Sequence, residues 1–212
     1  MSANNQSAQG GDNHINLYEP HVWKHHTKVA GLEWKNPVGT ASGTFQYAAV
    51  RWFYDVSQIG AVCTKGASPV PWEGNPSPRT AESPAANINA VGLQNPGIDH
   101  YLAEDLPKLK AAGAFVISNV AGHCDDDYAA VVEKLADSDA DMLEINVSCP
   151  NVSAGGRSVG TDPVALANLM DRLRPMTDKP MIVKLTPNVT DITVPARAAV
   201  EHGADALSMI NT

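Results

Sequence analysis

The sequence predicts an α/β fold of the (β/α)8 TIM-barrel type, with about the first six strand–helix units present in the chain. Apolar runs of strand length alternate with amphipathic segments of helical periodicity, which is typical of a parallel sheet with right-handed crossovers. A closed barrel has eight such units in about 250 residues, whereas this chain has 212 residues. A doubly wound open sheet is the alternative. The absence of a Gly-x-Gly-x-x-Gly motif after the first strand argues against it.

The chain is predicted to have two parts. Residues 1–27 are expected to form a flexible N-terminal tail, because residues 1–14 are polar and rich in Asn, Ser, Gln and Gly. The tail has no apolar signal-peptide core, so a cytoplasmic protein is expected. Residues 28–212 are expected to form the partial barrel domain.

The strands are predicted from short apolar runs bounded by turn residues. A short pair, Lys28–Gly31 and Leu32–Trp34, comes first and is followed by a turn at residues 35–37. The expected core strands are Pro37–Ala41, Gly60–Thr64, Ala114–Val120, Asp141–Val147, Pro180–Leu185 and Ala204–Ile210.

Helical segments between these strands carry recognisable start and stop signals. Asp162 is a suitable N-cap and Pro163 suits the first helical position, while Gly113 and Gly203 each close a helix. Residues 67–96, which hold six of the 15 prolines, are expected to form a long functional loop. The expected helices are Ala48–Ser57, Asp99–Ala112, Asp125–Ala136, Asp162–Met176 and Thr190–His202.

Composition excludes several classes of function. The net charge is −8, from 23 acidic and 15 basic residues, which argues against a nucleic-acid surface. No apolar run reaches the roughly 18 residues that cross a bilayer, so no membrane partner is expected. The three cysteines, Cys63, Cys124 and Cys149, have no CxxC spacing and are expected to be reduced, with Cys63 and Cys124 serving in packing. The histidines lack ligand-like spacing, so no metal site is expected.

Polar side chains stand at or just beyond the carboxyl end of every predicted core strand, where ligands bind in parallel α/β folds. Lysine is almost never fully buried without a partner, so the two lysines in this set require an anionic or electron-rich neighbour. Lysines, carboxamides and a thiol together suit a planar, anionic ligand with several hydrogen-bonding groups. The residues are Ser42 and Gly43, Lys65 and Gly66, Asn119, Asn146 and Cys149, Lys184, and Asn211 with Thr212.

The same positions carry a family resemblance. From about residue 28 onward the chain resembles the catalytic subunit of class 1 dihydroorotate dehydrogenases, most closely the 1B type. The motifs Asn-x-Ser-Cys-Pro-Asn at 146–151 and Gly-Leu-Gln-Asn-Pro-Gly at 92–97 are specific, whereas Ala-Ser-Gly at 41–43 and Lys-Gly at 65–66 are weak alone. The matching stretches, which include these motifs, are 36–45, 64–66, 89–97, 118–122, 144–151, 184–188 and 210–212.

The resemblance implies oxidation of dihydroorotate to orotate in UMP biosynthesis, with FMN as the hydride acceptor. Cys149 would be the general base, and a lid at about Val152–Gly160 would exclude water. Substrate would be held by Lys65, Asn89, Ala90, Val91, Gly92, Leu93, Asn146, Asn211 and Thr212. FMN would be lined by Ser42, Lys65, Gly66, Asn119, Asn146, Lys184 and Ile210.

The resemblance also implies partners. A subunit with FAD and an iron–sulfur cluster would carry electrons to NAD, and the chain would form a homo-oligomer. The family's FMN phosphate site lies beyond the units present, so this chain alone is expected to bind FMN poorly. Two alternatives stay open: a dihydropyrimidine dehydrogenase-like flavin reductase, and a non-catalytic binding or assembly module.

Overall fold

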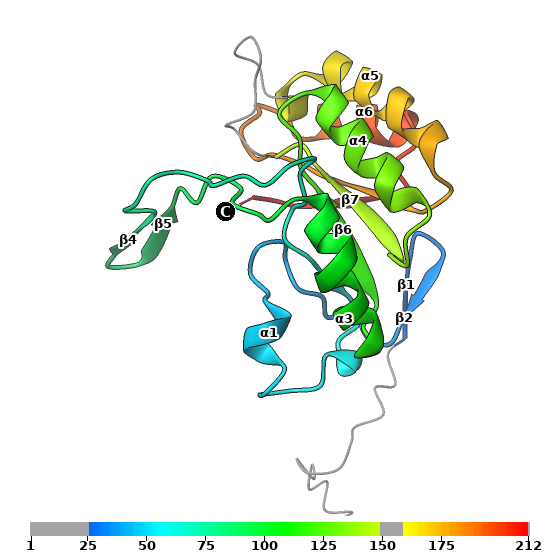
Figure 1. The fold of residues 1–212 in the computed structure, drawn as a ribbon. Helices are drawn as coiled ribbons and strands as arrows, with labels where there is room; N and C mark the ends of the chain where they lie inside the picture. The colour runs from blue at the N-terminus through cyan, green and yellow to red at the C-terminus, as the bar shows by residue number, and fades with distance from the viewer. Residues whose placement is uncertain (1–25, 149–158, 212) are drawn as a thin grey trace, which may run out of the picture.

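In the computed structural model, which describes residues 26–148 and 159–211, a curled parallel sheet forms the centre of the molecule (Figure 1). Its five strands are hydrogen-bonded in chain order, β3-β6-β7-β8-β9. A doubly wound sheet reverses its strand order at a switch point, whereas a barrel sheet runs in one direction. The order therefore confirms the barrel-type prediction. The strands are β3 (Val62–Cys63), β6 (Val116–Val120), β7 (Met142–Asn146), β8 (Met181–Lys184) and β9 (Ala206–Ser208).

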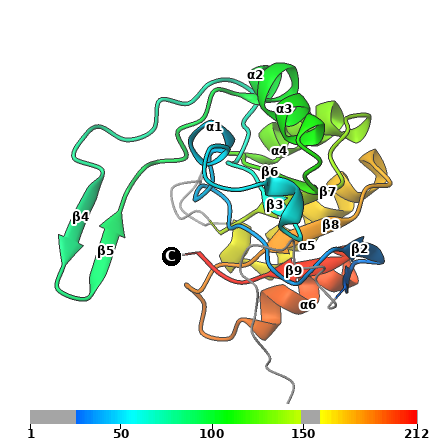
Figure 2. The same cartoon turned by 90° about the horizontal axis from the view of Figure 1, so that it is seen from below.

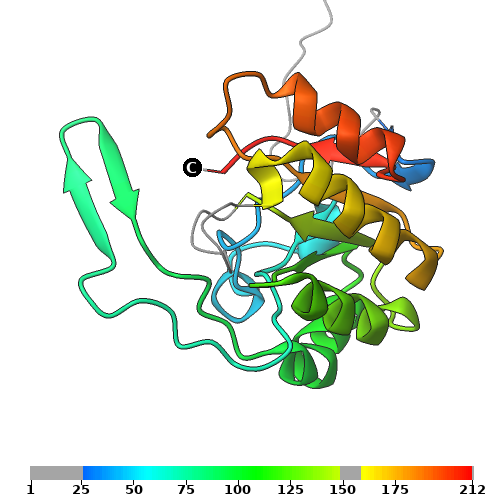
Figure 3. The same ribbon diagram turned by 90° about the horizontal axis from the view of Figure 1, so that it is seen from above.

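Helices follow the strands and cover the convex side of the sheet in sequence order (Figure 3). The Asp162 side chain accepts hydrogen bonds from the backbone N–H groups of Val164 and Ala165, as its predicted N-cap role requires. The long helices are α3 (Leu106–Ala111), α4 (Asp125–Ala136), α5 (Pro163–Leu173) and α6 (Thr193–Glu201). Shorter segments are α1 (Tyr47–Val50), η1 (Val56–Gln58), α2 (Ile98–His100), the π-helix η2 (Tyr101–Asp105), η3 (Val159–Thr161) and η4 (Arg174–Met176).

Alternation along the strands separates two buried layers. On β7, Leu143 and Ile145 pack with residues of α4 and α5 in the main core. Met142 faces the opposite side and belongs to a second cluster with Ile117 and Ile182. Because side chains alternate along a strand, Glu144 and Asn146 lie on the same face as Met142. The concave interior of the sheet therefore changes from apolar to polar toward the carboxyl ends of the strands.

A short hairpin covers the apolar end of this interior. Strands β1 (Thr27–Val29) and β2 (Leu32–Trp34) pair antiparallel, as predicted, with Thr27 opposite Trp34. The Trp34 side chain packs against the second cluster and lies 5.9 Å from the Phe115 ring centroid. The view along the sheet shows the hairpin beside β9 (Figure 2). The interior is thus closed at the amino ends of the strands.

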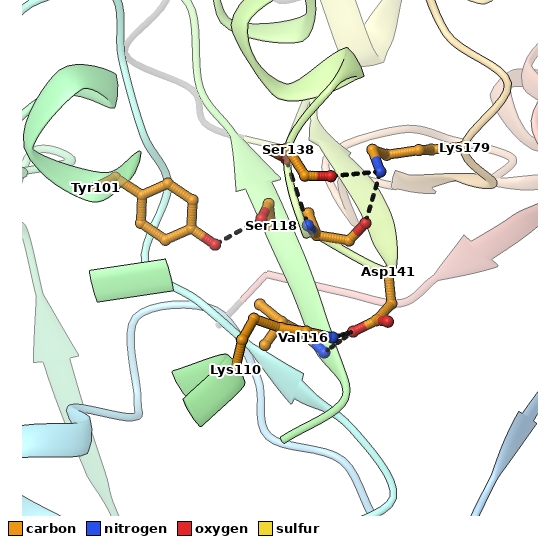
Figure 4. A network of polar contacts seen from close by, with 8 residues as sticks. Tyr101, Lys110, Val116, Ser118, Ser138, Asp141 and Lys179 are labelled. Carbon is orange, nitrogen blue, oxygen red and sulfur yellow. Dashed lines mark hydrogen bonds and ion pairs between the residues drawn. The ribbon is translucent and has the colours of Figure 1, made fainter. Parts of the chain in front are cut away.

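Two matching polar ties fasten the amino ends of the strands. Asp141, just before β7, accepts hydrogen bonds from the Val116 N–H at 2.7 Å and the Lys110 ammonium at 2.6 Å (Figure 4). In the same way Asp205, just before β9, accepts from the Met181 N–H at 2.8 Å and the Arg174 guanidinium at 3.0 Å. Each aspartate joins the first residue of the neighbouring strand to a cation from the helix that leads into that strand.

Three local predictions were wrong. Residues 37–41 form a single parallel bridge, Gly39 to Ala61, in place of a strand. The helix expected at Ala48–Ser57 is limited to α1 and η1, and the intervening Trp52 and Phe53 are exposed. The loop expected at 67–96 contains an antiparallel hairpin of β4 (Thr80–Ser83) and β5 (Ala86–Asn89), which extends from the body of the molecule (Figures 1 and 3).

The remaining boundaries lie close to prediction. The other core strands and the helices α4, α5 and α6 each fall within or near their expected ranges. Strand β1 begins at Thr27, the last residue of the expected tail. Within the described ranges, no helix combines the length and apolarity needed to cross a bilayer.

Candidate functional site

The carboxyl ends of the sheet bring four of the predicted site residues to one face. Asn119 is the next-to-last residue of β6. Asn146 and Lys184 are the last residues of β7 and β8, and Lys65 follows β3. Strand register places Asn146 directly opposite Lys184. Because all four positions have the same parity as the interior-facing residues below them, their side chains share the concave side.

The two asparagines form a directed hydrogen-bond chain. Asn146 Nδ2 donates to Asn119 Oδ1 at 3.5 Å, and Asn119 Nδ2 donates to Glu144 Oε1 at 2.6 Å. The backbone N–H of Ser148 donates to Asn146 Oδ1 at 3.3 Å. Asn119 is fully buried and Asn146 nearly so. The Tyr128 hydroxyl, from α4, donates to the Asn146 carbonyl at 2.8 Å and fixes the end of β7 from the other side.

Glu144 is a site component that the sequence analysis did not identify. Its carboxylate is only 6 % exposed and accepts from Cys63 Sγ at 3.2 Å, Asn119 Nδ2 and Ser208 Oγ at 2.8 Å. It thereby links four strands of the sheet. The signal was present, because an acidic residue in the middle of the apolar strand 142–146 is rarely buried without partners.

The Cys63 thiol is held in its neutral form. Burial raises the pKa of Cys63 well above its usual range, and the neighbouring Glu144 carboxylate raises it further. The Lys184 ammonium opposes this shift in the pKa of Cys63. A buried thiol with a raised pKa is a poor nucleophile, in keeping with the packing role expected for Cys63. Cys124 is exposed, so its expected packing role was wrong.

Two glycines pack closely against side chains of this rim. A Cβ on Gly66 would lie 2.7 Å from Asn119 Oδ1, which is closer than van der Waals contact allows. Gly43 has φ of +81°, and a Cβ there would lie 3.4 Å from Lys65 Nζ. Ser42 next to it is half-buried. The Ser-Gly and Lys-Gly pairs therefore lie beside one another, and Gly66 lets the backbone approach the Asn119 carboxamide more closely than a residue with a side chain could.

A cavity of about 840 Å³ adjoins the rim on the α1 side. Lys65 and Gly66 line it together with Tyr47, Trp72 and Tyr101. Its lining comes from residues 64–67, which follow β3, and from α1, residues 94–97 and η2. It includes neither Asn119 nor Asn146, so the cavity is next to the Asn119–Asn146 chain rather than over it. We therefore take the interior rim as the candidate site.

The predicted substrate segment 89–93 lies at the end of the β4–β5 hairpin and just after it. Asn89 and Ala90 are exposed, whereas Val91, Gly92 and Leu93 are half-buried. Gly92 and Leu93 both have positive φ, +74° and +53°. A Cβ on Gly92 would lie 2.6 Å from the Asn75 backbone nitrogen, so the turn requires glycine there.

The end of the same motif has a structural role. The Asn95 side chain is buried, and its Oδ1 accepts from the Ser68 N–H, the Ser68 hydroxyl and the Gly97 N–H. These bonds join the two ends of the 67–96 segment. The Gln-Asn-Pro-Gly part of the motif is therefore explained by folding of the segment, and the preceding residues remain the candidates for ligand contact.

The other predicted residues lie at the chain's final strand or outside the described ranges. Asn211 Nδ2 donates to the Ser148 carbonyl at 3.4 Å, so it reaches the end of β7. Ile210 is 46 % exposed. Cys149, Thr212 and residues 152–158 of the expected lid lie outside the described residues.

Comparison with known proteins gives one family. A family model described as dihydroorotate dehydrogenase matches residues 24–212. The chain is 51% identical over 188 residues to "Dihydroorotate dehydrogenase B (NAD(+)), catalytic subunit" of Alkaliphilus metalliredigens, covering 87% of this chain and 61% of the relative. It is 50% identical to the protein of the same name from Lachnoclostridium phytofermentans, with 87% and 62% covered. It is 47% identical to "Putative dihydroorotate dehydrogenase A (fumarate)" of Aquifex aeolicus, with 87% and 61% covered.

The family-model match includes all the described strands and the rim residues. The chain spans about 61% of the length of the relatives that it matches. Because the family model covers nearly all of the chain beyond its N-terminal segment, the chain belongs to the dihydroorotate dehydrogenase family.

Proposed function

We propose that the protein oxidises dihydroorotate to orotate, with FMN as the hydride acceptor, in the biosynthesis of UMP. Relatives named dihydroorotate dehydrogenase B support the reaction. The observation that carries the proposal for this chain is the buried Asn119–Asn146 chain between two half-buried lysines, Lys65 and Lys184. Such a set of amides and cations on one face fits a planar ligand with acceptor oxygens and ring N–H groups.

The rim residues fit FMN as the cofactor. Gly66 packs directly against the Asn119 carboxamide and lines the adjoining cavity, and the buried Ser148 hydroxyl has no hydrogen-bond partner among the described residues. FMN would supply the acceptor for the hydride that leaves the substrate. We assign Ser42, Lys65, Gly66, Asn119, Asn146, Lys184 and Ile210 to its binding.

We assign the proton-abstracting step to Cys149, which follows Ser148 directly at the end of the β7 segment. Substrate would be held from one side by Lys65 and Asn146 and from the chain end by Asn211 and Thr212. Residues 89–93 would complete the pocket from the hairpin side. A thiol, whose ordinary pKa lies between about 8.5 and 9, needs only a modest shift to act as a base near neutral pH.

The proposal also names the final electron acceptor. We favour NAD, reached through a partner subunit with FAD and an iron–sulfur cluster, because relatives at 51% and 50% identity are named as NAD(+) catalytic subunits. Fumarate is the competing acceptor, since a relative at 47% identity is named for it. A homo-oligomer in the cytoplasm is part of the same proposal. We expect FMN phosphate contacts to come from the part of the relatives that this chain does not span.

The test is anaerobic mixing of the FMN-loaded, full-length protein with dihydroorotate. The flavin absorbance band should bleach within the mixing experiment and recover when the acceptor is added. Dihydrouracil is the matched control, because it lacks the carboxylate that Lys65 would hold. Bleaching by dihydrouracil alone would favour the dihydropyrimidine dehydrogenase-like reductase, and no bleaching with either would reduce the chain to a binding module.

A further inference from the structure

Glu144 is the charged group at the end of the buried Asn119–Asn146 chain. Its partners on the interior face are neutral donors from three other strands: Cys63, Asn119 and Ser208. We propose that Glu144 is a positioning residue, which fixes the orientation of the Asn119 and Asn146 carboxamides and thereby the hydrogen-bonding edge that the site offers to its ligand. The identity of that ligand as FMN rests on the proposed function.

The two ends of a carboxamide differ in hydrogen bonding. One end donates and the other accepts, and the two have nearly the same shape, so surrounding groups decide the orientation. An ionised carboxylate only accepts. Asn119 must therefore turn Nδ2 toward Glu144, at 2.6 Å, and Oδ1 away from it.

The orientation of Asn119 also determines the orientation of Asn146. Asn119 Oδ1 can only accept, so Asn146 turns Nδ2 toward it, at 3.5 Å. Asn146 Oδ1 then accepts from the Ser148 N–H at 3.3 Å. Every donor in this run of bonds points toward Glu144. Ser148 directly precedes the proposed base, so the orientation set at Glu144 also reaches the backbone from which Cys149 follows.

The position of Asn119 Oδ1 connects this orientation with ligand binding. That oxygen packs directly against Gly66, where an added Cβ would approach it to 2.7 Å, and Gly66 itself lines the adjoining cavity. With Glu144 in place, Asn119 turns an acceptor toward the Lys65-Gly66 turn, which the proposed function assigns to FMN. Reversal of this carboxamide would also reverse the Asn146 carboxamide, which is the less completely buried of the two. A ligand that meets Asn146 would then find the opposite hydrogen-bonding edge.

The first part of the experiment needs no ligand. In the full-length protein, Asn119→Asp places two carboxylates in contact, and the midpoint of urea unfolding should fall. Adding Glu144→Gln should restore most of the loss, because the Gln amide can donate to the introduced carboxylate. Ser208→Ala is the matched control: it removes another partner of Glu144 and should give no rescue. Failure of Glu144→Gln to rescue would overturn the proposal.

Asn119→Asp is a change at a fully buried position, so a second readout covers the case in which that variant is recovered only as unfolded protein. In that case, a folded Asn119→Asp/Glu144→Gln double variant supports the proposal. An unfolded double variant, with Glu144→Gln alone folded, overturns it.

The second part reads out ligand binding. Glu144→Gln alone should weaken FMN binding by about tenfold, because the carboxamides are no longer held in one orientation, whereas Ser208→Ala should change it by less than about threefold. Wild-type affinity in Glu144→Gln would contradict the link to the ligand. If the wild-type protein binds no FMN, the proposed function fails, and the unfolding experiment still decides the role of Glu144.

Discussion

Charged side chains at the two ends of the parallel sheet have different surroundings. At the amino ends, Asp141 and Asp205 each meet a backbone N–H and a cation from the preceding helix, so each charge has a partner in a neighbouring element. At the carboxyl ends, Lys65 and Lys184 flank carboxamides, with glycine in place of bulkier side chains. In barrel folds the first end serves stability and the second serves function. The arrangement of charged groups, and not their number, therefore distinguishes the two roles.

The largest effect should come from Cys149→Ala at the carboxyl end. Loss of a general base should lower kcat for dihydroorotate by about a thousandfold, with the unfolding midpoint unchanged. Anaerobic single-turnover bleaching of the flavin measures the effect on the chemical step. Cys124→Ala, at an exposed position, is the control and should have wild-type kinetics. A near wild-type rate in Cys149→Ala would exclude this residue as the base.

Two lysines at opposite ends of β8 offer a matched pair. Lys184→Met should weaken FMN binding by about 10-fold to 100-fold with little loss of stability, because a charge held at the rim for the ligand is removed. Lys179 Nζ instead donates to the carbonyls of Ser138 and Ala140 at 2.7 and 2.9 Å. Lys179→Met should lower the free energy of unfolding by about 1–2 kcal/mol and leave FMN affinity intact. Flavin titration and urea unfolding measure the two effects in both variants. Loss of FMN affinity in Lys179→Met together with loss of stability in Lys184→Met would contradict these roles.

The aspartate tie can be tested alone. Asp141→Ala removes the acceptor of the Val116 N–H and of the Lys110 ammonium, so the free energy of unfolding should fall by about 2 kcal/mol. KM and kcat should not change, because the site lies at the other end of the sheet. Glu104→Ala, which breaks an exposed i,i+4 pair with Lys108, should have little effect in the same urea titration. A large change in kcat for Asp141→Ala would show that the two ends are coupled.

The smallest effect is a dependence of stability on alkaline pH. Burial raises the pKa of Tyr101 to about 12, and burial with the Glu144 charge raises the pKa of Cys63. Both groups therefore hold their protons more tightly when folded. Their contribution to stability is complete below the ordinary values of 9.0 and 10.0 and is lost as the pH rises through the folded values.

Urea unfolding between pH 8 and pH 11 measures this loss. Cys63→Ser should flatten the decline that begins near pH 9, and Tyr101→Phe the part above pH 10. Tyr101→Phe also removes the bond to the Ser118 hydroxyl, so its stability should be lower at every pH. An equal slope in all three proteins would mean that other groups cause the decline.

The sequence predicted the elements whose stability comes from the core. Short apolar runs predicted the strands at 141–147 and 180–185. Helical periodicity and acidic residues at the start predicted the helices at 125–136 and 162–176. The structure contains all four elements near those bounds. Strand 37–41 was wrong because its length was inferred from its place in the repeat, whereas only Gly39 pairs in the structure. Hairpin β4–β5 was missed because every residue in its two strands is exposed, so no alternation of buried and polar positions marks it.

The candidate site shows the same limit. Lys65, Asn119, Asn146 and Lys184 could be predicted because each stands at the end of an apolar strand. Glu144 could not be assigned a role, since its significance depends on partners 25 to 81 residues away in the chain. Pairing across strands that are distant in sequence is a property of the folded sheet.

The tip of the β4–β5 hairpin can change in sequence and length without affecting the buried core. At its base, the Arg79 guanidinium contacts the Gln94 side chain and the carbonyls of Glu73 and Asn75. Beyond this clamp, the side chains of both strands are exposed and contribute nothing to either buried layer. Insertions, deletions or substitutions at the tip should therefore leave the barrel intact. Evolution can thus remodel the arm that carries Asn89 without having to preserve a folding core there.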